Sequence, residues 1–243
     1  MSLSRRQFLG AGAAVTAATA VAPGIRLVEL ALARNPEEAA TAAQRWGLLI
    51  DTTKCADDCS ACVDACVEEH DLWGFAREQT DPQWIRIVEL VDRQTGHKQR
   101  LPVMCQHCEH PPCVDVCPTG ASMKRADGIV LVDRHVCIGC RYCMMACPYK
   151  ARSFVHESLP FKKEYNPRGK GCVESCTLCY HRVDAGEGTT ACAEACKKAG
   201  HEALLFGDLK DPESEIAKRM KAERTTQLRA DLGLNTGVRY TGL

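Results

Sequence analysis

Aromatic residues are scarce in this chain: phenylalanine, tryptophan and tyrosine make up only 5% of its 243 residues. Net charge is absent as well, because 31 basic side chains balance 31 acidic ones. Such a chain offers no electrostatic case for binding nucleic acid or an anionic membrane surface. It also lacks the run of about 20 strongly apolar residues that a membrane-spanning helix needs. We therefore expect neither a nucleic-acid partner nor a transmembrane segment.

The first 33 residues are predicted to be an export signal. Ser4-Arg5-Arg6-Gln7-Phe8-Leu9 resembles the twin-arginine motif, and a weakly apolar stretch follows from Gly10 to Ala22. Ala31-Leu32-Ala33 fits the A-x-A cleavage pattern, which would start the mature chain near Arg34. The twin-arginine route moves folded proteins, so it suits a cofactor that is inserted in the cytoplasm. We predict a periplasmic protein exported in folded form, and cleavage of the signal stays open.

Cysteine is the residue in excess, with 17 copies in four groups. The groups are Cys55, Cys59, Cys62 and Cys66; Cys105, Cys108, Cys113 and Cys117; Cys137, Cys140, Cys143 and Cys147; and Cys172, Cys176, Cys179, Cys192 and Cys196. An odd number, with many C-x-x-C neighbours, argues against a disulfide framework. Structural zinc sites use two C-x-x-C knuckles separated by a loop, and the second and third groups depart from that spacing.

The third group, CIGCRYCMMACP, is the C-x2-C-x2-C-x3-C-P run of bacterial ferredoxins, and the second group follows it with a longer middle gap. The fourth cysteine of such a run ligates the other cluster. We therefore predict one [4Fe–4S] cluster on Cys105, Cys108, Cys113 and Cys147. Its partner would use Cys137, Cys140, Cys143 and Cys117. Gly139 is expected to ease the backbone of the loop that approaches the cluster.

The first and fourth groups are predicted to form a second, less regular pair around the first. Nesting assigns a third cluster to Cys55, Cys59, Cys62 and Cys196, and a fourth to Cys176, Cys179, Cys192 and Cys66. The first group has a C-x3-C spacing, and no proline follows either of the cysteines that end these groups. Cys172 is the seventeenth thiol. It is expected to be a free cysteine, with replacement of a neighbouring ligand as the alternative.

The remaining pattern predicts an α+β fold of two nested ferredoxin-like units with loop-rich insertions. Strands are expected at 45–51, 128–134, 151–157 and 202–208, and an amphipathic helix after Asp211-Pro212 should bury Ile216, Met220 and Ala217. The predicted segments are the signal (1–33), the first half of the outer unit (34–100), the inner unit (101–160), the second half of the outer unit (161–210) and a C-terminal helix and tail (211–243).

No catalytic residue is predicted. The sequence has no phosphate loop, no dinucleotide fingerprint and no paired nucleophile and base. Histidines stand near the cysteines at His107, His110, His135 and His181, but no cysteine position is missing for them to replace. They are expected to pack or hydrogen-bond near a cluster. Since protein thiolates saturate every predicted cluster, the chain should have no small-molecule substrate of its own.

The order of the four groups resembles that of the four-cluster iron–sulfur subunits of dimethyl sulfoxide, polysulfide, tetrathionate and nitrite reductase complexes. The likeness rests on CQHCEHPPCVDVCP, CIGCRYCMMACPY and the C-x2-C-x12-C-x3-C pattern from Cys176 onward, and it runs from about Arg45 to Gly242. Within this family, RWGLLIDTTKC, LPVMCQHCEHPPCVDVCPTGAS and CMMACPYKARSFVHE are most similar to the periplasmic DsrO-type subunits of dissimilatory sulfur metabolism.

The resemblance implies a relay of single electrons rather than an enzyme. One partner would be a quinone-interacting membrane protein of the NrfD/PsrC type, through which the chain would associate with the membrane. The other would be a redox protein such as a periplasmic cytochrome c or a catalytic subunit. The alternative is an electron-transfer subunit of a molybdopterin-dependent reductase or of a nitrite reductase complex.

Overall fold

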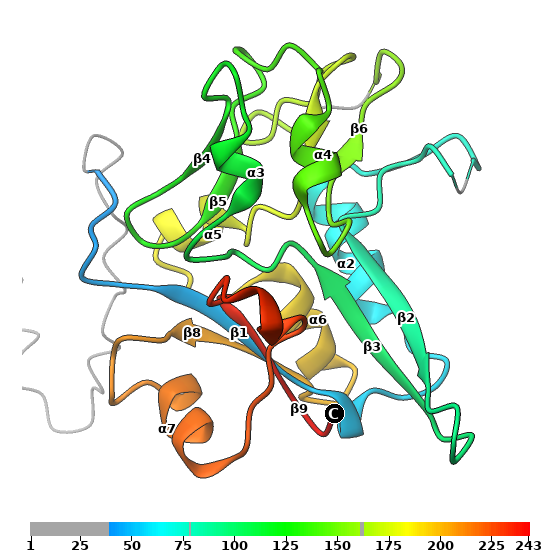
Figure 1. The fold of residues 1–243 in the computed structure, drawn as a ribbon, viewed down its shortest axis with the longest axis vertical. Coiled ribbons are helices and arrows are strands. Elements are labelled where there is room, and N and C mark those ends of the chain that lie inside the picture. Colours follow the sequence, from blue (N-terminus) through cyan, green and yellow to red (C-terminus); the bar gives the residue numbers. More distant parts are fainter. Residues whose placement is uncertain (1–38, 78, 161–162) are drawn as a thin grey trace, which may run out of the picture. The chain divides into compact units, whose positions relative to one another are not determined.

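Residues 39–77, 79–160 and 163–243 are described by a computed structural model, and the predicted signal at 1–33 lies outside them. Short helices and small sheets joined by long loops make up the described residues (Figure 1). This is the α+β class that the sequence predicts. None of the helices in these residues has both the length and the apolar character to cross a membrane.

The central sheet has three strands in the order β8-β1-β9. β1 (Trp46–Asp51) pairs antiparallel with β8 (Leu204–Asp208) and parallel with β9 (Val238–Thr241). Leu48, Leu49 and Ile50 form an unbroken apolar run and are all but fully buried, as expected for a strand covered on both faces. The strand that enters the first cysteine group therefore lies beside the strand that leaves the fourth, as the nested arrangement requires.

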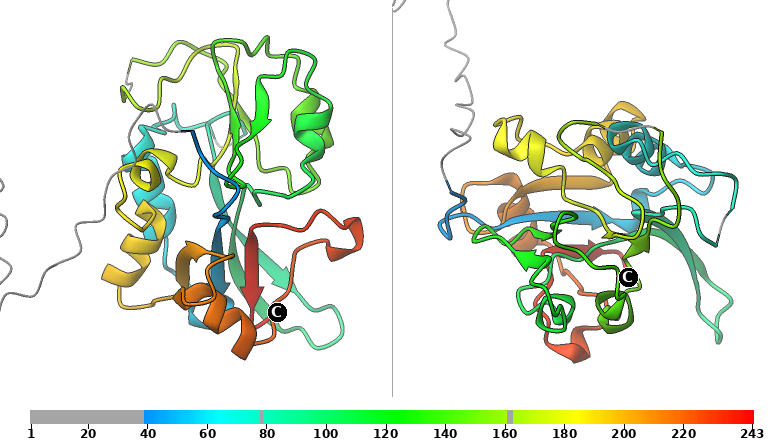
Figure 2. Two further views of the ribbon diagram at one scale, coloured as in Figure 1. Left: turned by 90° about the vertical axis from the view of Figure 1, so that its left-hand side faces the viewer. Right: turned by 90° about the horizontal axis from the view of Figure 1, so that it is seen from above.

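Two helices that carry cysteines pack against each other on one side of this sheet (Figure 2). They are α2 (Ala61–His70) and α6 (Ala191–Lys198). The Thr190 side chain caps α6 by accepting a hydrogen bond from the backbone of Ala193. Each helix bears two cysteines four residues apart, and this spacing puts both on one helix face. These cysteines are Cys62 and Cys66 on α2, and Cys192 and Cys196 on α6.

The second and third cysteine groups occupy the part of the chain drawn in green in Figure 1. Here α3 (Pro112–Asp115) contacts α4 (Tyr142–Ala146), and β4 (Ser122–Lys124) pairs with β5 (Val130–Val132). β6 (Ser153–Phe154) pairs with β7 (Val173–Glu174). β5 and β6 lie inside the predicted strands at 128–134 and 151–157 but are shorter. The β6–β7 pairing crosses the segment boundary predicted at residue 160.

The remaining elements close the structure around these cysteines. β2 (Ile85–Val91) and β3 (Lys98–Met104) form an antiparallel hairpin, and α7 (Glu215–Ala222) packs against β8. In α7, Ile216 and Ala217 are buried as predicted, and Met220 is half-buried. Three shorter pieces are the 3₁₀ turns Thr52–Lys54 and Ala230–Leu232 and the helix α5 (Tyr180–Asp184).

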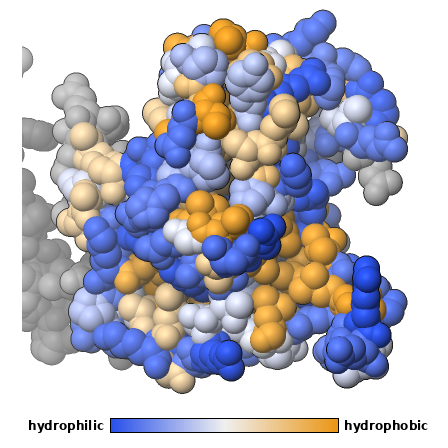
Figure 3. Space-filling model, viewed as in Figure 1, coloured by the Kyte–Doolittle hydropathy of each residue, from blue (hydrophilic) through white to orange (hydrophobic). Residues whose placement is uncertain are grey.

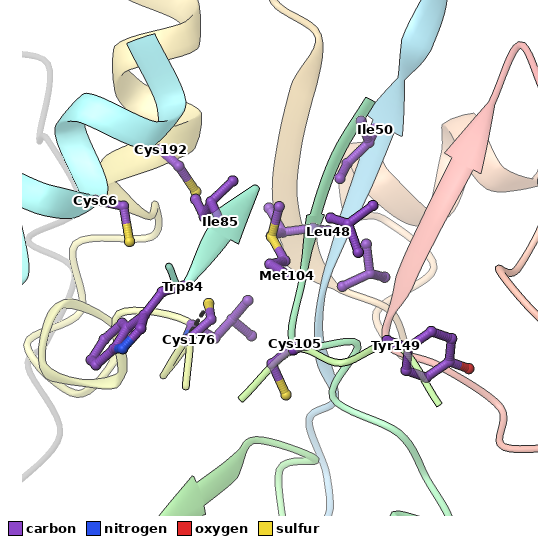
Figure 4. Close-up of a cluster of buried hydrophobic side chains, with 14 of the residues drawn as sticks. Leu48, Ile50, Cys66, Trp84, Ile85, Met104, Cys105, Tyr149, Cys176 and Cys192 are labelled. Carbon is purple, nitrogen blue, oxygen red and sulfur yellow. Dashed lines mark hydrogen bonds between the residues drawn. The ribbon is translucent and has the colours of Figure 1, made fainter. Parts of the chain in front are cut away.

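Cysteines and ordinary apolar residues share one core. Figure 4 shows Leu48 and Ile50 of β1, and Met104 of β3, in the same interior as four cysteine side chains, which are Cys66, Cys105, Cys176 and Cys192. A single cysteine is often buried as a small hydrophobic residue. A core that contains cysteines from four separate groups indicates that the thiols have a chemical role as well.

Candidate metal centres

All seventeen cysteines lie in the described residues, and none of them forms a disulfide. Twelve are buried, four are half-buried and Cys140 is exposed. A disulfide framework is therefore not what holds this core together. The spatial grouping of the thiols is the observation that bears on function.

The first set combines the first group with the end of the fourth. Cys55, Cys59 and Cys62 line one cavity together with Cys196 of α6. Its other walls are largely apolar, with Ile87, Leu101, Pro102 and Leu204 among them. Burial raises the pKa of Cys62 to about 12, and the neighbouring thiols reinforce the shift. These are the four cysteines that the sequence assigns to the third cluster.

The second set is wholly internal. Cys66, Cys176, Cys179 and Cys192 are each 7% exposed or less. Figure 4 shows Cys66 on α2 and Cys192 on α6 extending into one interior space, with Cys176 at its edge. Burial raises the pKa of Cys66 well above its ordinary value, and the charges of Cys176 and Cys192 add to that effect. The structure thus brings the first and fourth groups together as the predicted fourth cluster requires.

His70 is a residue near this set that sequence reasoning missed. It is 2% exposed, and its Nε2 lies 3.5 Å from Cys179 Sγ. Burial lowers the pKa of His70 to about 3, so the ring is neutral at physiological pH. Its position at the end of α2, four residues after Cys66, was the only signal in the sequence.

The third set is also internal. Cys105, Cys108, Cys113 and Cys147 are each 8% exposed or less. Burial raises the pKa of Cys108 to about 12, with the other three thiols as its charged neighbours. This set joins the first three cysteines of the second group to the last cysteine of the third, as the ferredoxin spacing predicts.

The fourth set reaches the surface. Cys143 is buried and has Cys137 among the thiols that act on it. Cys117 and Cys137 are half-buried and Cys140 is exposed. Cys117 Sγ accepts a hydrogen bond from the backbone N–H of Ser122 at 3.3 Å and contacts the Thr119 hydroxyl. The structure brings Cys137 and Cys143 together and places Cys117 and Cys140 at the outer end of this region.

Backbone N–H groups donate to cysteine sulfurs in three of the other loops as well. The pairs are Val173 N to Cys137 at 3.5 Å, Leu178 N to Cys176 at 3.4 Å, and Ala203 N to Cys196 at 3.3 Å. N–H groups aimed at sulfur suit a thiolate that carries negative charge, as a cluster ligand does. The donors present therefore fit an iron–sulfur cofactor.

The spread of the thiols also bears on the kind of metal site. A zinc ion bound at 2.3 Å draws its sulfurs to within about 4 Å of one another. Within the described part of the chain, no three cysteine, histidine, aspartate or glutamate side chains converge around a single ion. Soft thiolate donors suit a polynuclear iron–sulfur cluster.

Cys172 lies beside the third cysteine group rather than inside the fourth. Its Sγ donates to the carbonyl oxygen of Arg134 at 3.3 Å, and the charge of Cys137 acts on its thiol. It is 8% exposed. Any ligand that Cys172 replaced would therefore belong to the set that contains Cys137. The place of Cys172 in the sequence, just before the fourth group, did not indicate this.

Comparison with known proteins agrees with this chemistry. Residues 97–157 match the 4Fe-4S dicluster domain family, and residues 2–22 match the twin-arginine translocation signal. The match confirms the predicted signal and with it the export of the folded protein to the periplasm. The dicluster match confirms that the chain binds [4Fe–4S] clusters.

Three relatives extend the match to nearly the whole chain. The chain is 43% identical to the Hdr-like menaquinol oxidoreductase iron-sulfur subunit 1 of Archaeoglobus fulgidus, over 99% of this chain and 98% of the relative. It is 36% identical to a tetrathionate reductase subunit of Salmonella typhimurium, over 100% and 90%. It is 38% identical to protein NrfC of Escherichia coli K12, over 96% and 92%. The chain therefore belongs to the family of iron–sulfur subunits of oxidoreductase complexes that carry the 4Fe-4S dicluster domain.

Proposed function

We propose that this chain is an electron-transfer subunit that holds four [4Fe–4S] clusters in a line. The observation that carries the proposal is the burial of the four cysteine sets. Two sets are closed off from solvent, while the other two contain the half-buried and exposed thiols. A relay needs an insulated interior and two accessible ends, and this distribution supplies both.

Electrostatic effects between thiols of neighbouring sets support a linear order. Cys143 of the set that reaches the surface has Cys113 of the next set among its charged neighbours. Cys176 has Cys105 among its own, and Cys62 has Cys192. The proposed order of ligand sets is Cys117, Cys137, Cys140 and Cys143; Cys105, Cys108, Cys113 and Cys147; Cys66, Cys176, Cys179 and Cys192; and Cys55, Cys59, Cys62 and Cys196.

Clusters of this kind, when bound, accept and release single electrons at potentials set by charge, hydrogen bonds and solvent exposure. The chain contributes the insulation and the ligands. With four thiols available to each cluster, no coordination position is left for a substrate. The chain itself is thus proposed to lack catalytic residues and to act only within a complex.

The two ends of the line carry apolar surface that suits protein partners. Near Cys140, the side chains of Ile138, Tyr142 and Met145 are 67%, 58% and 73% exposed. At the other end, the β2–β3 hairpin that walls the Cys55 cavity exposes Leu90 and Val91. Figure 3 shows hydrophobic surface in both regions, at the top of the view and along the hairpin. Exposed apolar side chains in numbers mark interaction sites.

We assign these ends to two redox partners. One is a quinone-interacting membrane protein of the NrfD/PsrC type, which would hold the chain at the membrane. The other is a periplasmic cytochrome c or a catalytic subunit. The relative named as part of a menaquinol oxidoreductase supports a quinone-linked role. The DsrO-like sequence features support a place in dissimilatory sulfur metabolism.

A second candidate function rests on the other relatives. The identities to the tetrathionate reductase protein and to NrfC favour a subunit of a molybdopterin-dependent reductase or of a nitrite reductase complex. Both candidates share the four clusters and differ in the partner.

Iron and acid-labile sulfide analysis, with EPR of the anaerobically purified chain, tests the four clusters. About sixteen irons per chain are expected from four cubanes. About eight irons would refute the assignment of the first and fourth groups. Co-purification from the membrane then separates the two candidates. Recovery of a quinone-reactive membrane protein and a cytochrome without a reductase supports the first, and recovery of a molybdopterin enzyme or a nitrite reductase supports the second.

A further inference from the structure

Arg152 is a buried cation placed among the cysteines of the second and third groups. It lies between α4 and β6 and is 6% exposed. Its Nη2 donates to Cys113 Sγ at 3.0 Å and to Ser122 Oγ at 2.8 Å. Burial raises the pKa of Cys143 above its usual value, and the Arg152 guanidinium opposes this shift by its charge and by hydrogen bonding. One guanidinium therefore reaches thiols of both clusters proposed for the segment 101–160, which we call the inner clusters after the predicted inner unit, although one of them reaches the surface.

The partners of Arg152 are unusual for a buried arginine. In the described residues its hydrogen bonds go to thiols and one hydroxyl, it forms no ion pair with a carboxylate, and its Nη1 is buried without a partner. Two other arginines that point inward each form an ion pair with a carboxylate. Arg168 is paired with Glu174 at 2.8 Å, and Arg125 with Asp127 at 2.7 Å.

A buried charge needs a compensating charge, because removing a lone guanidinium from water costs several kcal/mol. Neutral thiols do not supply it. Thiolates on a cluster supply the compensating negative charge. The three cysteines with the largest electrostatic effect on Arg152 are Cys113, Cys105 and Cys143, which belong to the ligand sets of the two inner clusters. The residues present thus fit anionic clusters on both sides of this side chain.

We propose that Arg152 is a positioning residue that raises the reduction potentials of both inner clusters. This inference rests on the proposed ligand sets. Each reduction adds one electron, and hence one negative charge, next to the fixed guanidinium, which favours the reduced form. Arginine stays protonated at any physiological pH, so the added electron brings no proton to this side chain, and its effect on the potentials is independent of pH.

The test is a potentiometric EPR titration of the full-length, cluster-loaded protein with Arg152→Gln, Arg152→Lys and a matched control. Arg125→Gln is that control, because it removes an inward arginine whose partners are carboxylates. In Arg152→Gln, two of the four reduction steps should shift to lower potential. The expected change is at least tenfold in the reduction equilibrium of each inner cluster, or about 59 mV for one electron.

Arg152→Lys keeps the charge and should leave both steps near their native potentials, between pH 6 and 8 alike. Arg125→Gln should move none. If Arg152→Gln keeps its iron and no step moves, or all four steps move together, the proposal is wrong. If Arg152→Gln loses iron, Arg152→Lys decides: native iron and potentials support the proposal, and iron loss overturns it. Failure of the proposed function is separate, since the native chain would then fall short of about sixteen irons.

Discussion

Cross-ligation between the first and fourth cysteine groups gives the sharpest test of the proposed ligand sets. Cys192 and Cys196 lie four residues apart on one face of α6, yet the predicted ligand sets assign them to different clusters. The structure separates them. Cys196 lines the cavity of the first group with Cys55 and Cys62, whereas Cys192 does not line that cavity. Cys192 acts on the buried thiols of Cys66 and Cys179, and it also acts on Cys62 in the neighbouring set.

Double alanine variants turn this separation into iron counts. If a cluster of about four irons is lost with its ligand, Cys196→Ala should lower the count from about sixteen to about twelve. Adding Cys62→Ala should remove no further cluster, because both residues serve the same one. Adding Cys192→Ala instead should remove a second cluster and leave about eight irons. The two double variants differ only through shared ligation, which is the logic of a double-mutant cycle.

Iron and sulfide analysis, with EPR spin counting of the reduced clusters, measures these outcomes. Spin counting covers the case in which a variant keeps a partly assembled cluster and loses fewer irons. Ligation of each cluster within a single group would reverse the result: Cys196→Ala with Cys192→Ala would lose one cluster, and Cys196→Ala with Cys62→Ala would lose two. That reversal would refute the nested assignment.

Three further predictions follow from single side chains. Cys172→Ala should leave the iron count at about sixteen, and loss of one cluster would identify Cys172 as a ligand. Gly139→Ala should lower the iron count, because Gly139 has a φ of 71° and an added Cβ would overlap the carbonyl oxygen of Gly171; Gly188→Ala, with a φ of 66° but open space around it, is the control and should keep its iron. Glu69→Gln should lower the Tm at pH 7 by about 2–8 °C, which corresponds to about 1–2 kcal/mol after solvent screening. Hydrogen bonds from Arg182 lower the pKa of Glu69 to about 2 from an ordinary 4.5, so its contribution is present above pH 4.5 and is lost as pH falls toward 2. The Tm difference should therefore stay constant from pH 8 to pH 5, and a difference that vanishes at pH 5 would contradict this explanation.

Local spacing in the sequence was enough to predict the α+β class and the regions of the β1, β8 and α7 elements. These elements follow from runs of adjacent residues, such as the apolar run at Leu48 to Ile50 or the Asp211-Pro212 pair before α7. The pairing of the strands could not be predicted in the same way. β7 joins β6 across a segment that local patterns had assigned to another unit, because strand pairing depends on contacts between distant residues. The β2–β3 hairpin was missed for a similar reason, because the sequence analysis treated its residues only as part of a loop-rich insertion.

The same limit applies to the site. Spacing could predict sixteen cysteines as ligands, but it could not place Cys172 beside Cys137 or show which nearby side chains are buried. Lys150 and Arg152 follow Pro148 within four residues, yet Lys150 is exposed and Arg152 is 6% exposed. Which of the two cations meets the thiols is decided by the way the chain turns into β6. No local pattern encodes that turn.

Burial of the thiols connects the cofactor with the route of export. Burial raises the pKa of Cys176 well above its ordinary value and that of Cys105 to about 12, so these side chains are neutral without metal. Cluster ligands must be thiolates, and binding therefore has to expel protons from the core. The buried Arg152 has the opposite need, since its charge is compensated only when those thiolates form. Folding and cluster binding thus stabilise each other, and a chain that crossed the membrane unfolded would lose both. A twin-arginine signal, which exports the protein already folded, meets the requirement that this core imposes.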